Sequence, residues 1–440
     1  MSVSITRCIG DAPSETDEHQ KGKKIRRPRI GLASGFRLRP ERGFSVSPGA
    51  RSLNYPRAAD GRAAQAAEAP ESYSRWVRQA MKAAAGEPDA AVLFDSTIRE
   101  PTDLMMDVVR RAFDGGVTDR YQSVFAEGNR FVTARVAERH GVAQDQVIGT
   151  TGATSAVALA LKALVAPGDN VIIEHPCFDL LPALARDAGA TVTALPRRAP
   201  DFATDADELA RLIRPDTRLV ILTQLHNPTG AVLDESALRA LGAVAARAGV
   251  PILVDEAYGD FVEGGVAAAR LGPEFISVGS LTKVQGLFAL KCGWAVGAPD
   301  MIAAINAAQP QGDLGVSKLA HAVAALVLED RAAFDAHWRS VLADAAPVVR
   351  GHVEAMTAEG LLEGAFPQFG CMAFPKVVGV ADTRALCDRL WTEHRILVTA
   401  GEFFGQPGHI RIGYGGGRTA ELDRGLTRLK DALLAYGRAS

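Results

Sequence analysis

Short apolar runs, rich in β-branched residues, alternate with helical stretches through the middle of the chain. The runs carry the sequences VIGT, NVIIEH, TVTAL, RLVILTQ, PILVDEA, FISVGS and CGWAVG. Helical spacing of apolar residues follows Ala153 and recurs over residues 180–188, around Leu209 and over residues 237–248. Continuous apolar strands separated by such helices are typical of a mostly parallel sheet that is covered on both faces. The pattern therefore predicts an α/β large domain.

The pattern differs at the two ends of the chain. Residues 1–70 contain the basic stretch KGKKIRRPR and little periodicity, which predicts a disordered or loosely attached extension; a nucleic-acid or targeting element is the alternative. We expect residues 71–118 to join the small domain and residues 119–305 to form the large domain. Longer helices and the strand signals CMAFPKVVGV and HIRIGYGG predict a smaller α+β domain over residues 306–440.

Composition narrows the class of protein. The chain has 440 residues, 47% of them hydrophobic, and a net charge of -2, so neither a nucleic acid nor a membrane is expected as a partner. No apolar run is long enough to span a membrane, and the N-terminus lacks the apolar region of a secretory signal. The five cysteines are scattered without a CxxC pair, which argues against a disulfide framework and a zinc site and favours a reducing cytoplasm. These features predict a small-molecule enzyme without a metal site.

Lys283 is the central candidate for chemistry. It lies in the stretch VGSLTKVQGLFALKCGWAVG, where one apolar strand breaks at Gly279 and another begins at Cys292. A lysine held between apolar segments loses its proton more easily, because desolvation disfavours the ammonium form. Such an amine can act as a nucleophile and form a Schiff base; a solvated surface lysine is the ordinary alternative.

Another candidate is the turn GTTGATS, which opens a helix directly after a strand. Small residues and hydroxyls there leave the first main-chain N–H groups free, and a helix N-terminus with free donors binds anions. An ordinary Thr or Ser N-cap is the alternative. The spacing matches neither a Walker loop nor a dinucleotide fingerprint, which disfavours nucleoside triphosphates and Rossmann cofactors.

Polar residues follow two of the predicted strands between this anion site and Lys283. Asn227 comes after LVILT in the sequence NPTG, and Asp255 ends PILVD, with Tyr258 three residues later. The intervals between Asn227, Asp255 and Lys283 are each one βα unit long, so we expect all three at the edge where open α/β sheets bind ligands. A carboxylate at a buried strand end requires a partner, and a protonated ring nitrogen would be one.

As a set, the GAT turn, NPTG, DEAY, SLTK and RIGYG resemble the motifs of pyridoxal-phosphate (PLP) enzymes of the aspartate aminotransferase type, fold type I, class I/II. The resemblance spans residues 94–433. It implies the PLP-dependent transferase fold, an α/β fold with a mostly parallel, seven-stranded type of sheet in the large domain and a smaller α+β domain. It also implies that Lys283 forms the Schiff base with PLP, while Asp255 pairs with the pyridinium nitrogen. Asn227 and Tyr258 would hydrogen-bond the 3-oxygen of the cofactor.

The same resemblance implies roles for residues around these three strand ends. Phe178 would stack on the pyridine ring, although a core phenylalanine is the alternative. Arg411 would clamp the substrate α-carboxylate, because a guanidinium fork meets both carboxylate oxygens; an arginine on an edge strand is the alternative. The residues expected to hold the cofactor phosphate are Gly152, Ala153, Thr154 and Ser280.

Three departures from the family pattern leave parts of the site open. Lys291 stands where the family usually has an arginine that pairs with the phosphate, and a lysine lacks the guanidinium fork. The segment FDSTIREPTDL lacks the usual glycine-centred pattern. Tyr121 and Phe125 lie near the position of the tyrosine that reaches the partner subunit's phosphate, but their spacing to Gly128 is unusual.

The resemblance predicts a PLP-dependent enzyme that acts on an α-amino acid through an α-carbanion, most simply an aminotransferase. A homodimer with shared active sites is the expected assembly. Elimination, replacement or cyclisation to a non-protein amino acid or specialised metabolite is the alternative, because YQSVFAEGN, LHNPTGA and SLTKVQGL resemble capreomycidine-synthase-like cyclases. A PLP-binding regulator is disfavoured, because residues 1–70 are too irregular for a helix-turn-helix domain.

Overall fold

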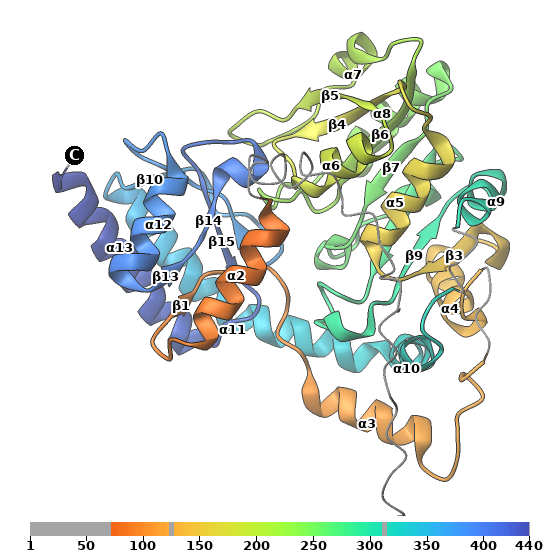
Figure 1. The fold of residues 1–440 in the computed structure, drawn as a ribbon, viewed down its shortest axis with the longest axis horizontal. Helices are drawn as coiled ribbons and strands as arrows, with labels where there is room; N and C mark the ends of the chain where they lie inside the picture. The colour runs from red at the N-terminus through yellow and green to blue at the C-terminus, as the bar shows by residue number, and fades with distance from the viewer. Residues whose placement is uncertain (1–71, 123–126, 310–314, 440) are drawn as a thin grey trace, which may run out of the picture. The chain divides into compact units, whose positions relative to one another are not determined.

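Figure 1 shows a computed structural model of the chain, which describes residues 72–122, 127–309 and 315–439. The described residues lie within the unit Pro70–Ser440. The extension predicted over residues 1–70 and the candidate Phe125 lie outside the described residues.

The largest sheet in the described part of the chain has seven strands, β3 to β9 (Figure 1). Its strands, in spatial order, are β3 (Val147–Thr150), β9 (Gly293–Val296), β8 (Phe275–Ser280), β7 (Ile252–Asp255), β6 (Thr217–Thr223), β4 (Asn170–His175) and β5 (Thr191–Pro196). All neighbouring strands are parallel except β9, which runs antiparallel to both β3 and β8. The mostly parallel sheet predicted from the apolar runs is confirmed.

Helices cover both faces of this sheet, which explains why its strands are apolar throughout. On one face, Ile221 and its neighbours pack against α5 (Ala153–Leu164), α6 (Leu180–Asp187) and α9 (Pro299–Ala307). On the other face, Val220 and its neighbours pack against α7 (Ala206–Leu212) and α8 (Glu235–Ala248).

Side-chain caps and glycines set the ends of the helices. The side chain of Asn129 accepts two main-chain N–H groups at the start of α4 (Arg130–His140), and Gly141 ends this helix with φ of 63°. Asp234 caps the start of α8, and Gly249 ends it with φ of 66°. Only glycine adopts this left-handed conformation without strain, so these glycines are effective helix stops.

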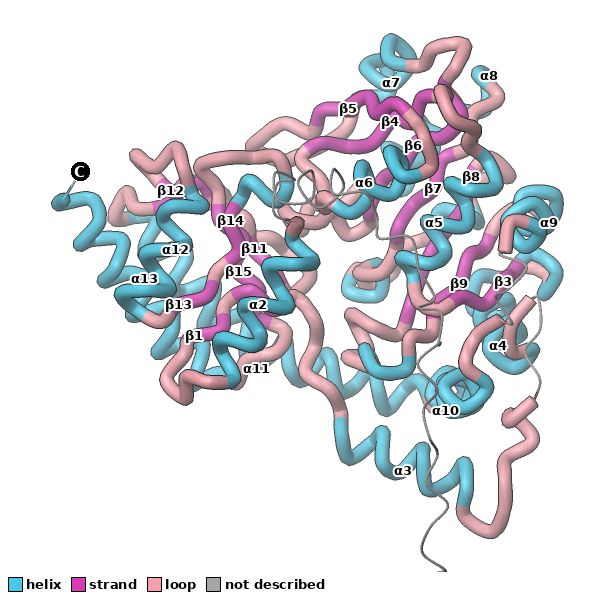
Figure 2. The backbone as a smooth tube through the Cα atoms, viewed as in Figure 1, coloured by secondary structure: helices cyan, strands magenta, loops and turns pink. Residues whose placement is uncertain are grey.

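A smaller sheet joins the two ends of the described chain. Strand β15 (Ile410–Tyr414) lies between β11 (Met372–Ala373) and β14 (Thr399–Ala400), and it also pairs in parallel with β2 (Phe94–Asp95). The core beside these strands contains residues of the long helices α11 (Arg331–Ala358), α12 (Thr383–His394) and α13 (Thr419–Ala439). Figure 2 shows the strands of this sheet in magenta beside those helices.

The strand predicted over CMAFPKVVGV is wrong as a single element. The structure breaks it into β11 and β12 (Lys376–Val377), and β12 pairs with β10 (Leu362–Glu363) instead of β15. Pro375 lies in the break, and a proline cannot donate a hydrogen bond to a neighbouring strand. The alternation of apolar residues was therefore no guide to the pairing here.

The remaining elements flank the two sheets. Helices α3 (Thr102–Phe113) and α10 (Lys318–Glu329) share a core cluster with α4 and β9, whereas α2 (Tyr73–Ala85) packs on Phe94 and Leu397 of the smaller sheet region. Strand β1 (Ala91–Val92) pairs with β13 (Ile396–Leu397). The domain boundaries drawn from the sequence stay a prediction. None of the helices in the described part of the chain has the length and hydropathy needed to cross a membrane.

Gly293 and Gly351 offer a matched test of the packing. A Cβ at Gly293 in β9 would collide with the main chain of Gly152, whereas a Cβ at Gly351 in α11 meets nothing within 4 Å outside its own helix. We expect Gly293→Ala to lower the free energy of unfolding by about 2 kcal/mol or more. Gly351→Ala should raise it by about 0.5–1 kcal/mol, since alanine favours the helix. Urea denaturation measures both changes, and equal effects at the two positions would contradict the packing described.

Candidate active site

Lys283 lies just beyond the end of β8 and reaches a segment that is distant in sequence. Its Nζ donates a hydrogen bond to Thr97 Oγ1 at 3.3 Å and lies 5.7 Å from the centroid of the Tyr258 ring. The main-chain N–H of Ile98 donates to the carbonyl oxygen of Lys283 at 3.0 Å. The predicted lysine is therefore partly buried between the end of the sheet and the segment that follows β2.

Asp255 ends β7, the strand beside β8. Its Oδ1 accepts the main-chain N–H of Ala257 at 3.0 Å. Burial raises the pKa of Asp255 to about 6, although the Ala257 N–H and the charge on Lys283 act in the opposite direction. Within the described residues Asp255 takes part in no ion pair. A carboxylate in this position favours a cationic partner at ion-pair distance, which none of the described residues supplies.

Arg411 and Asn227 meet across the two sheets. Arg411 on β15 is 1% exposed, and its Nη1 donates to Asn227 Oδ1 at 2.9 Å. Its Nη2 donates to the Tyr73 hydroxyl at 2.5 Å and to the Phe94 carbonyl at 3.3 Å. Nε has no partner among the described residues, and all the hydrogen-bond partners are neutral. A buried guanidinium without an anionic partner is suited to bind a carboxylate.

The predicted anion site lies at the N-terminus of α5. Gly152 precedes this helix with φ of 95°, and no side chain of the described residues caps the first turn. The Thr150 hydroxyl donates to the Gly152 carbonyl at 3.0 Å, so it does not cover the free N–H groups. Gly293 on β9 is in register with Thr150 on one side and with Ser280 on the other. The sheet therefore brings Ser280 close to the start of α5.

Tyr258 and Phe178 each contact a residue of the N-terminal segment. The Tyr258 hydroxyl lies 2.9 Å from Ser96 Oγ, and burial raises the pKa of Tyr258. Phe178 is partly buried and meets the Tyr73 ring edge to face, with the ring centroids 5.6 Å apart. Tyr73, Ser96 and Thr97 were missed in the sequence, because no local motif marks residues that reach the site from a distant segment.

Lys291 is exposed and lies near Lys283. Its Nζ is 3.5 Å from the centroid of the Phe288 ring, and its main chain has a φ of 48°. Partial burial lowers the pKa of Lys291, and the positive charge of Lys283 adds to the effect. Tyr121 is also exposed, with Lys318 Nζ 4.1 Å from its ring centroid.

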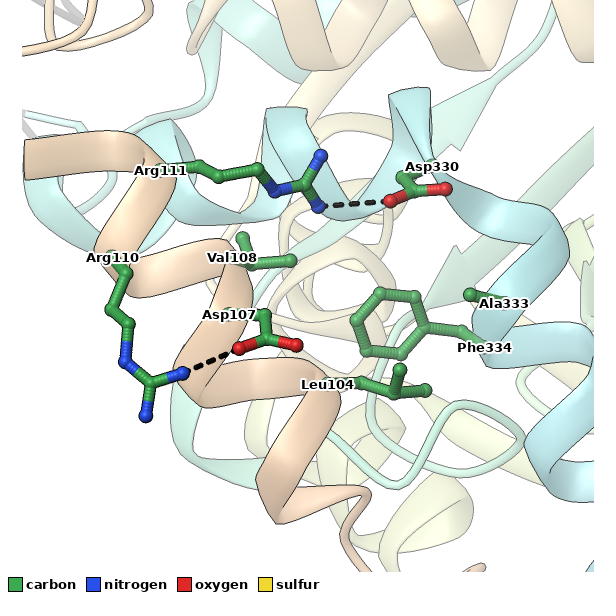
Figure 3. Close-up of a pocket in the computed structure, with 8 residues that line it drawn as sticks. All are labelled: Leu104, Asp107, Val108, Arg110, Arg111, Asp330, Ala333 and Phe334. Carbon is green, nitrogen blue, oxygen red and sulfur yellow. Dashed lines mark hydrogen bonds and ion pairs between the residues drawn. The ribbon is translucent and has the colours of Figure 1, made fainter. Parts of the chain in front are cut away.

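Figure 3 shows a surface pocket that is separate from these residues. It has a volume of about 380 Å³ and an apolar wall that includes Leu104 and Phe334. Arg111 forms an ion pair with Asp330 across it at 2.8 Å. No predicted site residue lines this pocket, so we do not assign it to the active site. The described residues also contain no cluster of His, Cys, Asp or Glu that could hold a metal ion.

Comparison with known proteins identifies the class. Residues 93–429 match the family model of aminotransferase class I and II. Capreomycidine synthase from Streptomyces vinaceus is 33% identical over 317 residues, which cover 71% of this chain and 80% of that relative.

Two solved structures are similar over most of the chain. The PLP-dependent cyclase OrfR is 28% identical, with a TM-score of 0.71 and coverage of 84% of this chain and 98% of that one. N-Succinyldiaminopimelate aminotransferase from Mycobacterium tuberculosis is 26% identical, with a TM-score of 0.70 and coverage of 81% and 97%.

The chain belongs to the aminotransferase class I and II family. It is a PLP-dependent, aminotransferase-like enzyme with the aspartate aminotransferase type of fold. The described residues fit this cofactor: α5 presents an uncapped N-terminus that suits a phosphate, and Asp255 is a carboxylate without a cationic partner. The family, fold and cofactor predicted from the motifs are confirmed.

Asp255→Asn tests the electrostatics of the site in the cofactor-free protein. The ordinary pKa of Asp is 3.8 and that of Asp255 is about 6, so the folded state binds a proton more readily between these values. This contribution to stability is present below pH 4 and is lost as pH rises through about 6. Relative to wild type, the variant should therefore gain about 1–2 kcal/mol as pH rises from 4 to 7, less than full burial implies because the side chain is partly exposed.

Urea unfolding at several pH values measures this difference. Asp344→Asn, on the exposed face of α11, controls for the loss of one negative charge. A gain for Asp255→Asn that did not change with pH would contradict the raised pKa.

Proposed function

We propose that the protein acts on an α-amino acid, most directly as an aminotransferase. The observation that carries this proposal is the placement of Lys283 and Asp255 at one sheet edge together with a buried Arg411 whose hydrogen-bond partners among the described residues are all neutral. The first two residues suit a covalently held, protonated ring, and the third suits the carboxylate that every α-amino acid carries.

The chain's own residues supply attachment, orientation and proton transfer. Lys283 would attach PLP and, once released as a free amine, would move the proton at the substrate α-carbon. Asp255 would hold the proton on the ring nitrogen. Bound PLP would supply an electron sink for the charge left on the α-carbon. Arg411 would orient the substrate by its α-carboxylate, which holds the α-proton toward the lysine.

Asn227 and Tyr258 are proposed to contact the 3-oxygen of the cofactor. Because Asn227 Oδ1 accepts from Arg411, the carboxamide N–H groups are left to donate to a ligand. Phe178 would stack on the ring. The residues proposed to hold the phosphate are Gly152, Ala153, Thr154, Ser280 and Lys291.

Lys283→Ala tests the attachment. Wild-type protein should show visible absorbance from bound PLP, and borohydride should fix the cofactor on the peptide that contains Lys283. The variant should lose both the attachment and the activity. As a matched control, Lys291→Arg should keep the attachment and hold PLP at least as tightly, since arginine adds a fork for the phosphate. PLP fixed on a different lysine would refute the assignment.

Cyclisation is the second candidate, because capreomycidine synthase and the cyclase OrfR are among the similar proteins. Both reactions begin with removal of the α-proton, so the same residues serve each. Product detection separates the two: an aminotransferase releases a 2-oxo acid and needs an amino acceptor, whereas a cyclase converts one substrate without an acceptor.

We propose a homodimer whose interface covers an apolar face around α3 and α10. The exposed apolar residues of this face are Met106, Phe113, Val117, Tyr121, Phe288 and Leu319. α10 contacts both α3 and the turn that carries Phe288, and Phe113 lies against Tyr121, so the residues form one region. A stable interface of this kind buries on the order of 2,000 Å².

The four described cysteines are free thiols, which supports a reducing, cytoplasmic location.

Leu319→Asp tests the interface, because a carboxylate buried between subunits weakens their association. Sedimentation should show a dimer for wild type and dissociation for the variant. Met81→Asp is the matched control, since Met81 is at least as exposed as Leu319 but lies on α2, outside this face, and its variant should stay dimeric. Mixing Lys283→Ala and Tyr121→Ala chains should restore partial activity if the sites are shared. A fully active wild-type monomer would rule the dimer out.

A further inference from the structure

Glu174 and Arg197 form an ion pair inside the protein, close to the strand end that precedes Asn227. Both side chains are 0% exposed, and Arg197 Nη1 lies 2.7 Å from Glu174 Oε2. Glu174 lies in β4 among apolar residues, and burial raises its pKa against the effects of Arg197 and a hydrogen bond from Thr223. An apolar pair can stabilise a core as well as a buried ion pair does, so stability alone does not account for these charges.

Thr223 connects the ion pair to Asn227. Its hydroxyl donates to Glu174 Oε1 and accepts the main-chain N–H of Asn227 at 3.2 Å. Because Arg197 pairs with the Glu174 carboxylate, this carboxylate accepts, and the Thr223 hydroxyl gives it the one proton it has. A hydroxyl that donates to a carboxylate becomes a better acceptor, which strengthens the bond to Asn227.

His226 anchors the same turn from its other side. Burial lowers the pKa of His226 well below its ordinary value, so the ring is neutral. Nε2 lies 2.9 Å from the Pro176 carbonyl and therefore carries the proton, while Nδ1 accepts from the Thr229 hydroxyl at 2.6 Å. Pro176 is two residues before Phe178. The turn that carries Asn227 is thus tied to the segment that carries the proposed ring-stacking residue.

We propose that Glu174 is a positioning residue for Asn227. Through the Thr223 hydroxyl it holds the main chain of Asn227, so that Oδ1 stays on Arg411 and the carboxamide N–H groups stay available to the 3-oxygen of PLP. This inference rests on the proposed function, because it uses the proposed contact between Asn227 and the cofactor.

Thr223→Val tests the connection, since valine keeps the shape and removes the hydroxyl. The readout is the pH midpoint of the change in visible absorbance of bound PLP. An N–H that donates to the 3-oxygen stabilises negative charge on that oxygen. The nitrogen that joins Lys283 to the cofactor then holds its proton less tightly. Losing this donor should raise the midpoint, in the same direction as Asn227→Ala and by on the order of half a pH unit. Thr223→Ser should restore the wild-type midpoint, because it restores the hydroxyl.

Thr217→Val is the matched control on the same strand. Thr217 is also buried; its hydroxyl donates to Asn170 Oδ1 at 3.1 Å and accepts the main-chain N–H of Arg214 at 2.9 Å. This variant should lose similar stability in urea without moving the midpoint, because Thr217 starts the strand and lies at the end opposite to Asn227. Glu174→Gln gives a second measurement of the same effect. The glutamine amide attracts the Thr223 proton less strongly than the carboxylate does, so this variant should also raise the midpoint.

The outcomes separate the inference from the proposed function. A midpoint moved by Asn227→Ala and Thr223→Val, but not by Thr217→Val, supports the inference. A midpoint that moves with Asn227→Ala but not with Thr223→Val overturns the role of Glu174 and leaves the role of Asn227 intact. A midpoint that moves with neither variant overturns both, since Asn227 then does not act on the cofactor.

Discussion

The parallel pairing of β6, β7 and β8 is the constraint on which the site depends. Thr223 is in register with Asp255, and Asp255 is in register with Val278. The three strands run in one direction and end at the same edge of the sheet. Asn227 follows the end of β6 there, and Lys283 follows the end of β8. A slip of one residue in this register would turn Asp255 to the opposite face of the sheet. The apolar residues on both faces make such a slip costly.

Asp255 and Arg411 are two charges for which the described residues supply no ion pair. Asp255 forms no ion pair with the described residues, and the hydrogen-bond partners of Arg411 among them are neutral, although Arg411 is buried and Asp255 is partly buried. Each is a cost to the folded chain that a suitable ligand would offset. Ligands that bind only the folded state also stabilise it, by an amount that grows with the logarithm of their concentration relative to the dissociation constant. A ligand that pairs with these two charges would therefore also raise the free energy of unfolding.

The sequence was most informative where chemistry follows a periodic element. Lys283, Asp255 and Asn227 each follow an apolar strand at one βα interval, so their common edge could be predicted, and the fold and cofactor followed from the motif set. Tyr73 and Thr97 could not be predicted, because their contacts cross 338 and 186 residues and no period relates them. The division of residues 371–380 was missed for a related reason: two-residue strands are too short to show alternation.

The hydrogen bond between Tyr73 and Arg411 has a consequence for how the enzyme is made. These residues belong to the first helix and the last strand of the described chain, so a ribosome must synthesise nearly all of the protein before they can meet. The sheet edge with Asp255 and Lys283 emerges more than a hundred residues earlier. A growing chain can therefore contain the residues proposed to hold the cofactor well before it contains Arg411, the residue proposed to bind the substrate carboxylate. On the proposed assignments, such a chain would carry the residues that attach the cofactor and would lack the one that orients an amino acid.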